Sequence, residues 1–454
     1  MTAAAGSRPA PLWKTYLGLL APMILTNILQ TTAGTIDGIY LGRMIGVEAV
    51  AAVSAFFPVF FLLLALVIGL SVGATVLVGQ AWGARDPAKV RTIAGAALWL
   101  TTGLALVVAL GGGLFAPELM RALGTPAAVL APAVTYARLM LMGAPLIFLL
   151  LLVTSMSRAV GDAVTPLWAL ALATAAAMAL TPAFIRGWFG LPKLGVASAA
   201  VSTLLAFALA LAWLLLRWRH SGHPLAPRAD LLRQSRPQAA LVRSILRIAV
   251  PASLQMLSMA AAEVVLLGLV NRHGVQATAA YGAVTQVMSW LQLPAMSLGI
   301  ATSILASHAI GAGHPGRIGA IVRTGLRLEW LITGGFVAAA YAAAPALVAV
   351  FLTDPGVAAT ALELLRIVAW SVVALGMANV LQGAMRASGS VLAPATLGMF
   401  AILGIELPTA FALNAWIGLR GIWCSYALAF IAMLVLNTAW FRWVWRHRRI
   451  GRMA

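Results

Sequence analysis

Charged residues and cysteine are scarce in this 454-residue sequence. Asp, Glu, Lys and Arg together make up 9% of it, whereas a soluble globular chain carries roughly 25%. Hydrophobic residues make up 62%, and the mean hydropathy is +0.98. The single cysteine, Cys424, excludes an intrachain disulfide. The shortage of charge excludes an ordinary soluble domain and makes the lipid bilayer the expected surroundings.

Motifs for metal or cofactor binding are also missing. No His or Cys spacing suits a metal ion, and neither a Walker-type glycine loop nor a dinucleotide fingerprint occurs. No cluster of His, Asp and Ser falls inside the apolar runs, where His308 is isolated. A lone histidine of this kind is more often a satisfied polar residue than a catalyst. The sequence therefore predicts no catalytic residues, no metal, no cofactor and no enzymatic activity.

Long apolar runs recur from Trp13 to Trp445, each able to cross about 30 Å of hydrocarbon as a helix. They are too long for the strands of a membrane barrel. The first run continues from Leu17 to Tyr40, so we expect it to remain as a span and not to be cleaved as a secretory signal. The twelve predicted spans cover residues 14–40, 49–80, 92–115, 129–157, 163–186, 194–217, 243–270, 277–309, 320–345, 357–385, 392–414 and 418–441.

The basic residues follow a pattern along the chain. Most of the 30 Lys and Arg residues fall in alternate connections between the apolar runs. A net charge of +19 would also suit nucleic acid, but topology explains this alternation better, and no nucleic-acid partner is expected. The positive-inside rule predicts a multi-pass protein of the cell inner membrane with both termini in the cytosol. A basic linker at 218–242 separates a predicted N-lobe, 1–217, from a C-lobe, 243–454, with a basic tail.

The two halves repeat one another. GVEAVAA at Gly46 matches GVQATAA at Gly274, and RAVGDAVTP at Arg158 matches RASGSVLAP at Arg386, both at a spacing of 228 residues. Chance matching of small apolar residues is the alternative, but ordered blocks at one spacing favour duplication. Six spans per half is an even number, so both halves insert in the same orientation, related by a pseudo-two-fold axis along the membrane normal. The predicted fold is an all-α membrane protein with about 12 transmembrane helices in two six-helix lobes.

A resemblance follows from the segments that open each half. LAPMILTNILQTTAGTIDGIYLGRMIG, IAVPASLQMLSMAAAEVVLLGLVNRHG, QAWGARD and SRAVGDAVTP resemble the multidrug and toxic compound extrusion (MATE) family, over essentially the whole chain. The resemblance implies a V-shaped pair of lobes, alternating access, and secondary active efflux of small cationic compounds in exchange for H⁺ or Na⁺. We expect a monomer. The alternative is a lipid-linked oligosaccharide flippase of a related fold, which would need basic residues in its cavity, whereas the charges inside these spans are mainly acidic.

Two positions depart from the family pattern. Some members carry Asn and Asp, four apart, in the fifth span before a proline; here the matching positions before Pro182 hold Ala177 and Thr181. The tenth-span Asp that helps to build a sodium site in other members is replaced by Leu375. These departures weaken a multi-residue proton site in the N-lobe and leave the identity of the coupling ion open.

Asp37 is the first candidate for ion coupling, because a carboxyl inside a span is costly and usually functional. It shares a helical stripe with Asn27 and Gln30 on the first span. The alternative is an aspartate at the end of a helix, wetted by lipid headgroups. The stripe favours the coupling role, and the family resemblance favours it further.

Glu263 is the second candidate, on the corresponding span of the second half. It shares a helix face with Gln255 and Met259 at i−8 and i−4. We interpret it as a site for a cation, either the coupling ion or the substrate, with a helix-packing glutamate as the alternative. Glu406, just before Leu407 and Pro408, is equally compatible with substrate binding and with a break in its helix.

Gln286 and Trp290 on the eighth span, with several methionines nearby, suggest an adaptable wall with polar handles. Tryptophan can hold a cation over its ring face. Ordinary helix packing explains each of these residues singly. Only their combination with Glu263 predicts a cavity for varied cations.

Overall fold

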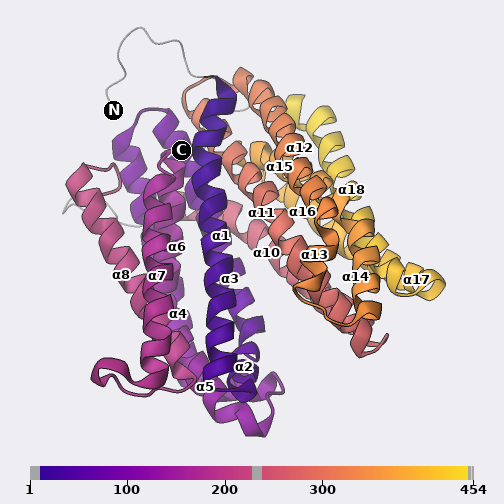
Figure 1. Ribbon diagram of the computed structural model, residues 1–454. Coiled ribbons are helices and arrows are strands. Elements are labelled where there is room, and N and C mark those ends of the chain that lie inside the picture. Colours follow the sequence, from indigo (N-terminus) through magenta and orange to yellow (C-terminus); the bar gives the residue numbers. More distant parts are fainter. Residues whose placement is uncertain (1–10, 227–237, 448–450, 452–454) are drawn as a thin grey trace. The chain divides into compact units, whose positions relative to one another are not determined.

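The protein is described here by a computed structural model, which covers residues 11–226, 238–447 and 451. All of the regular elements in this part of the chain are helices (Figure 1). Residues 227–237 of the predicted linker and all but Gly451 of the tail after His447 lie outside the described residues.

The helices of the first half correspond to the six spans predicted there. Two of those spans consist of two helices each, because the chain breaks at Ala55–Phe56 and at Gly143. The bounds are α1 Leu12–Met44, α2 Val47–Ser54, α3 Phe57–Gly83, α4 Pro87–Ala122, α5 Ala127–Met142, α6 Ala144–Ala159, α7 Val164–Arg186, the short η1 Trp188–Gly190 and α8 Ala197–Ser221.

The second half follows the same order with different breaks. A seven-residue π-helix, η4 Phe400–Glu406, interrupts the eleventh predicted span. The other bounds are α10 Ala239–Asn271, α11 Val275–Gly311, η2 Pro315–Arg317, α12 Ile318–Ala342, α13 Ala344–Ala349, α14 Pro355–Val368, η3 Ala369–Ser371, α15 Val372–Ala387, α16 Leu392–Met399, α17 Leu407–Ile417, α18 Leu419–Trp443 and η5 Trp445–His447.

Most of these helices are suited to a bilayer. Within the described ranges, ten helical segments are long and apolar enough to cross a membrane, and the α5–α6 pair, bent by 49°, makes an eleventh. The remaining predicted span is α12, whose first half carries Arg323, Arg327 and Glu329. The structure therefore confirms an all-helical membrane protein with eleven or twelve spans.

The repeat seen in the sequence extends to the backbone. Gly46 and Gly274, one repeat apart, precede α2 and α11 with positive φ angles of 127° and 92°. Gly161 and Gly389 form a second such pair, at 90° and 78°. Side chains with a Cβ avoid this region of φ, so glycine is the residue that suits these four turns.

The helices gather into two compact units, named here unit 1 and unit 2. Unit 2 runs from Leu25 to Leu257, and unit 1 contains the chain up to Ile24 and from Ser258 onward. Both boundaries fall inside helices, α1 and α10, and neither lies in the linker. The predicted lobes 1–217 and 243–454 with a linker at 218–242 stay a prediction.

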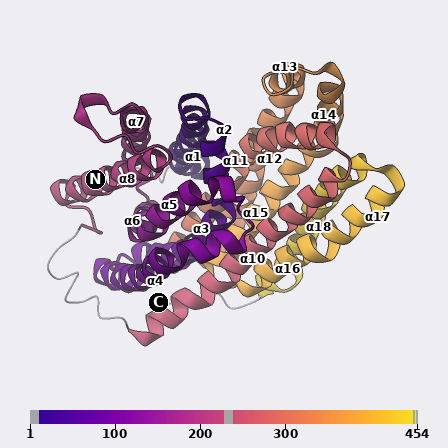
Figure 2. The same cartoon turned by 90° about the horizontal axis from the view of Figure 1, so that it is seen from below.

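Each unit has its own apolar core. In unit 2, Phe56, Met120 and Phe148 are buried where α3, α4, α5 and α6 pack together. In unit 1, α15 packs against α11, α12 and α18, around Leu365 and Trp423 (Figure 2). These two cores hold in place the helices that carry the polar groups described next.

Candidate functional site

Asp37 lies on the part of α1 that belongs to unit 2. Its Oδ1 atom accepts a hydrogen bond of 3.2 Å from the Thr181 hydroxyl of α7. Thr181 is fully buried and directly precedes Pro182, while Asp37 is half-buried. The threonine that departs from the family pattern is thus the recorded partner of the candidate carboxyl. A hydroxyl can donate to an ionised carboxylate or accept from a protonated one.

The polar stripe around Asp37 lies along a thinly covered face of α1. Asn27 is half-buried and Gln30 is exposed. A Cβ placed on Gly34 or Gly38, which share this part of the helix, would meet no atom within 4 Å. Thr181 of α7 and Tyr136 of α5 lie near the carboxyl, whereas the positions of Gly34 and Gly38 on α1 face open space.

Glu263 lies on the part of α10 that belongs to unit 1, where two phenols hold its carboxylate. The Tyr281 hydroxyl of α11 donates to Oε1, and the Tyr426 hydroxyl of α18 donates to Oε2 at 3.0 Å. The two phenolic oxygens lie 2.9 Å apart. We call Glu263, Tyr281 and Tyr426 the tyrosine–glutamate cluster.

The cluster has three close oxygen contacts but only two phenolic protons. When Glu263 is ionised, both protons point at the carboxylate, and the contact between the phenols has no proton to share. One proton added to Glu263 completes a ring, in which the carboxyl, Tyr426 and Tyr281 each donate to the next. The geometry can therefore hold a proton, or exchange it for another cation beside the carboxylate.

Aromatic rings and a second carboxyl surround this cluster. The Trp423 ring lies 5.2 Å from that of Tyr281 and 5.4 Å from that of Tyr426, between centroids. Glu406, the last residue of η4, is 4% exposed, and its charge interacts with those of Glu263 and Tyr426. A π-helical turn is rare and often marks a functional site. It ends here at the carboxyl that faces the cluster.

The other residues predicted to bind substrate lie on the same two helices as Glu263 and Tyr281. Met259, one turn before Glu263 on α10, is 42% exposed, and Gln255 lies two turns before Glu263. Gln286 and Trp290 are half-buried on α11. Nine residues along a helix turn it by about 180°, so Trp290 points away from the face that carries Tyr281.

Sequence reasoning missed Tyr281 and Tyr426. The chain has six tyrosines, and a phenol inside an apolar span needs a polar partner for its hydroxyl. That rule would have selected both residues. It would not have paired Tyr426 with Glu263, because the two lie 163 residues apart in the sequence, although Tyr281 is only 18 residues from Glu263.

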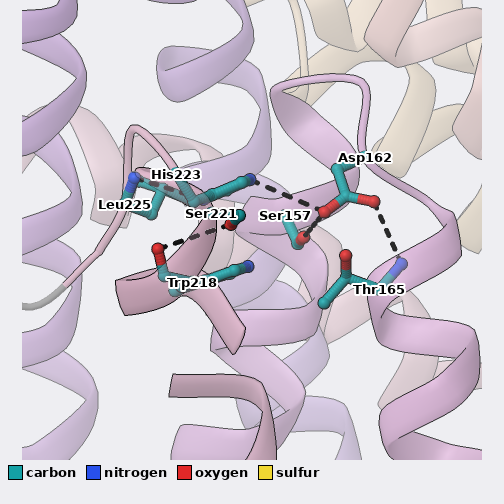
Figure 3. A network of polar contacts seen from close by, with 7 residues as sticks. All are labelled: Ser157, Asp162, Thr165, Trp218, Ser221, His223 and Leu225. Carbon is teal, nitrogen blue, oxygen red and sulfur yellow. Dashed lines mark hydrogen bonds and ion pairs between the residues drawn. The ribbon is translucent and has the colours of Figure 1, made fainter. Parts of the chain in front are cut away.

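A third polar network lies outside the spans, where the loop between α6 and α7 meets the end of α8 (Figure 3). Asp162 accepts from the Thr165 amide at 3.0 Å and from the Ser157 hydroxyl at 3.4 Å. The Nε2 atom of His223 lies 3.6 Å from Oδ2 of Asp162. The imidazole ring stacks on the Trp218 ring, with 4.5 Å between the ring centroids.

The hydrogen bonds fix the tautomer of His223 in this network. The Leu225 amide donates to Nδ1 at 3.3 Å, so the ring proton of the neutral form lies on Nε2, toward Asp162. Burial lowers the pKa of His223 below its usual value, and the nearby Asp162 carboxylate opposes this shift. The network ties two connections of unit 2 together and gives the histidine a structural role.

Comparison with known proteins adds an independent observation. The family model described as MatE matches residues 22–183 and 251–412, one block in each half. The probable multidrug resistance protein YoeA of Bacillus subtilis (strain 168) is 36% identical, over 98% of this chain and 97% of its own length. The probable multidrug resistance protein YpnP of the same strain is 27% identical, over 90% of each chain.

Solved structures agree on the fold. A structure described as the outward-facing conformation of a multidrug resistance MATE family transporter of the MOP superfamily matches with a TM-score of 0.88. It is 24% identical and covers 95% of each chain. At that identity the likeness shows the fold alone.

Proposed function

The chain belongs to the MATE family of membrane transporters, and from this premise we propose that it exports organic cations by alternating access, in exchange for protons. The relatives YoeA and YpnP are both named as probable multidrug resistance proteins, which supports this class of substrate. The observation that carries the proposal is the pairing of a carboxyl in each unit with hydroxyl partners from a neighbouring helix.

Asp37 is the proposed coupling group. Its recorded partner is one hydroxyl, that of Thr181, whereas hard metal cations take about six oxygen ligands. This small number of partners favours H⁺ over Na⁺. Exchange of one proton for one monovalent cation moves no net charge, so the pH gradient drives it; each further proton per cation would add about 3.5 kcal/mol at about 150 mV.

The tyrosine–glutamate cluster, with Glu406 beside it, is the proposed site for the cationic substrate. Its carboxylate attracts positive charge strongly away from water, and the rings of Tyr281 and Tyr426 offer the faces that bind organic cations. A substrate cation would replace the proton that closes the hydrogen-bonded ring. Binding of substrate and of a proton at Glu263 would then be mutually exclusive, whereas Asp37 couples the transport cycle to the gradient.

The orientation is part of the same proposal. We place both termini and the 218–242 linker on the cytosolic side of the inner membrane. In this orientation most Lys and Arg residues fall in the cytosolic connections. Labelling of cysteines introduced into the linker tests this orientation. If an impermeant reagent added outside intact cells labels these cysteines, the linker lies outside the cell and the proposed orientation is wrong.

Efflux by the purified protein in liposomes tests the function directly. A proton gradient and a sodium gradient are imposed separately, with a fluorescent organic cation as the cargo. The proposal expects the proton gradient alone to drive accumulation. Transport driven only by sodium would overturn the choice of ion, and no transport of any cation tried would overturn the substrate class.

A further inference from the structure

The α12 helix carries a carboxyl group that neither of the sites above uses. Glu329 is fully buried in unit 1. Neither of its carboxyl oxygens has a hydrogen-bond partner within the described part of the chain, and none of the ion pairs there includes it. The Thr333 hydroxyl, one turn further along α12, lies near enough to interact with the carboxyl but outside hydrogen-bonding geometry.

The space for this carboxyl is provided by a glycine on the neighbouring helix. A Cβ placed on Gly376 of α15 would overlap the carboxyl of Glu329. Any other residue at 376 would therefore have to displace the glutamate. The Glu329 side chain therefore occupies a space between α12 and α15 that exists only because residue 376 is glycine.

The repeat provides an internal comparison for this pocket. One repeat earlier, Glu329 and Gly376 correspond to Thr101 and Phe148, both buried in unit 2. The first half thus combines a short side chain with a large one, and the second half combines a long acid with a glycine. Thr333 corresponds to Ala105. Only the second half has a carboxyl at the first of these positions and a hydroxyl one turn further along the helix.

The surroundings of Glu329 include hydroxyl groups but no recorded opposite charge. One turn before it, the Tyr16 hydroxyl lies between Thr302 and the Ile321 carbonyl, at 3.1 and 3.0 Å. The titratable groups of the elements packed on α12 are Tyr281 and His308 of α11, Arg386 of α15 and Arg317 of η2, with Arg323, Arg327 and Tyr341 on α12 itself, and Tyr16 of α1 also contacts α12. Within the described residues, none of them forms an ion pair with Glu329.

An ionised carboxylate is not stable in such a position. Burial of an unpaired charge costs far more than burial of a neutral carboxyl, which needs one proton and fewer partners. A sodium ion would neutralise the charge as well, but it needs several oxygen ligands, and Glu329 and Thr333 supply three oxygen atoms at most. The proton is the ligand that suits the site.

We propose that Glu329 is a further proton-binding carboxyl of the transporter, protonated while α12 packs on Gly376 and deprotonated when that packing opens. The proposal rests on the proposed function, because the proton is exchanged during transport. It places a proton site in unit 1, on a helix different from those of Asp37 and of the tyrosine–glutamate cluster. The row formed by Tyr16, Thr302, Glu329 and Thr333 along one side of α12 consists of groups that can pass a proton on.

Infrared difference spectroscopy of the purified protein in lipid films tests the protonation itself. A protonated carboxyl without a hydrogen-bond partner absorbs apart from ionised and hydrogen-bonded carboxyls. We expect this band at neutral pH in the wild type, its loss in Glu329→Gln, and its retention in Glu263→Gln and Glu406→Gln. We also expect it to disappear as pH rises or as a cationic substrate is added.

Two spectroscopic results would overturn the proposal. A band that Glu329→Gln leaves unchanged would mean that this carboxyl is not protonated. A Glu329 band that persists at every pH, with and without substrate, would mean a permanently neutral packing group. Neither result depends on transport, so both are decisive even if the liposome experiment finds no ion-driven efflux.

A count of protons moved per substrate gives a functional test. If the liposome efflux is present, Glu329→Gln should move one proton fewer per cation than the wild type, and Glu329→Asp should restore part of the difference. An unchanged proton count in Glu329→Gln, alongside normal wild-type transport, would refute the role of Glu329 and leave the proposed function standing.

Discussion

The two units carry carboxyl groups in very different surroundings, although their sequences derive from one repeat. In unit 2, Asp37 has one hydrogen-bond partner among the described residues, the Thr181 hydroxyl, and the glycines beside it on α1 face open space. In unit 1, Glu263 is held by two phenols beside tryptophan and a second carboxyl, and Glu329 is enclosed against a glycine. The acidic positions are not equivalent: Asp37 corresponds to Val265, and Glu263 to Thr35.

This asymmetry suggests how a duplicated protein divides its tasks. A carboxyl with one partner changes little in structure when it gains a proton, which suits an ion that loads and unloads repeatedly. A carboxyl among rings can recognise the shape and charge of an organic cation. The experiments below test whether the units differ in this way, from the largest expected effect to the smallest.

The largest effect is expected for Asp37→Asn, which removes the titrating group and nearly preserves its shape. The variant should insert and bind substrate but lose accumulation driven by a proton gradient, a loss of about tenfold for each pH unit imposed. Liposome efflux measures it, with the exposed Glu48→Gln as the matched control. Proton-driven transport near the wild-type level in Asp37→Asn would place coupling in unit 1.

Glu263→Gln should affect recognition more than coupling. Loss of the charge removes charge-assisted hydrogen bonds worth about 1.5–3 kcal/mol, so binding of cations should weaken by roughly tenfold to a hundredfold. Binding of a neutral compound of similar size should change little. Fluorescence titration of the purified protein compares the two ligands. Equal losses for both would assign Glu263 to structure or to ion coupling.

Gly376→Ala is expected to destabilise unit 1, because the new Cβ overlaps the Glu329 carboxyl. Overpacking of this kind costs about 1–3 kcal/mol. Shortening the acid should relieve it, so the double variant with Glu329→Thr should recover stability. Thermal unfolding in detergent gives both values. A cost that stays the same in the double variant would mean that the two side chains do not meet.

Removal of single phenols should have smaller effects. Tyr281→Phe or Tyr426→Phe deletes one hydrogen bond to Glu263, worth about 0.5–1.5 kcal/mol net, and keeps the ring. Cation affinity should fall by about two- to tenfold. The double variant should lose less than the sum, because each single variant already breaks the ring and loses the contact between the phenols. Additive losses would argue against the ring.

Much of this fold could be predicted from the sequence, because each span in a bilayer must satisfy its own backbone hydrogen bonds. Apolar length alone therefore located the helices. The breaks were harder to predict: the π-helix before Glu406 has no counterpart in α7, although the repeat aligns the two segments. Such a turn depends on tertiary packing, which local sequence does not reveal.

The candidate sites were predictable only in part, for a similar reason. A carboxyl within an apolar run stands out by its cost, which identified Asp37, Glu263 and Glu406. The partners Thr181 and Tyr426 lie 144 and 163 residues from the carboxyls that they contact, and Tyr281, on the helix after that of Glu263, does not mark a site by its residue type alone. Glu329 was missed because two arginines precede it on α12. Charged residues in succession are typical of the solvent-exposed end of a span. The structure shows both arginines exposed and the glutamate buried.

The smallest effect concerns the network of His223 and Asp162, a control region of unit 2 outside the proposed sites. The folded-state pKa of His223 lies below its usual value because of burial, so the folded protein favours the neutral ring. Its contribution to stability is complete above the unfolded pKa of about 6.5 and is lost as pH falls through the folded pKa. His223→Phe keeps the stacking on Trp218 but removes the titration and the contact with Asp162. It should cost about 1 kcal/mol at pH 8.

The pH profile of unfolding separates this effect from a general loss of packing. The difference in melting temperature between wild type and His223→Phe should shrink as pH falls from 8 to 5, because only the wild type loses its histidine contribution. The exposed His220→Phe, on the same helix end, should show no such convergence. A constant difference at all pH values would mean that His223 acts through its shape alone. The pH dependence of transport could then be assigned to the carboxyls within the spans without correction for this network.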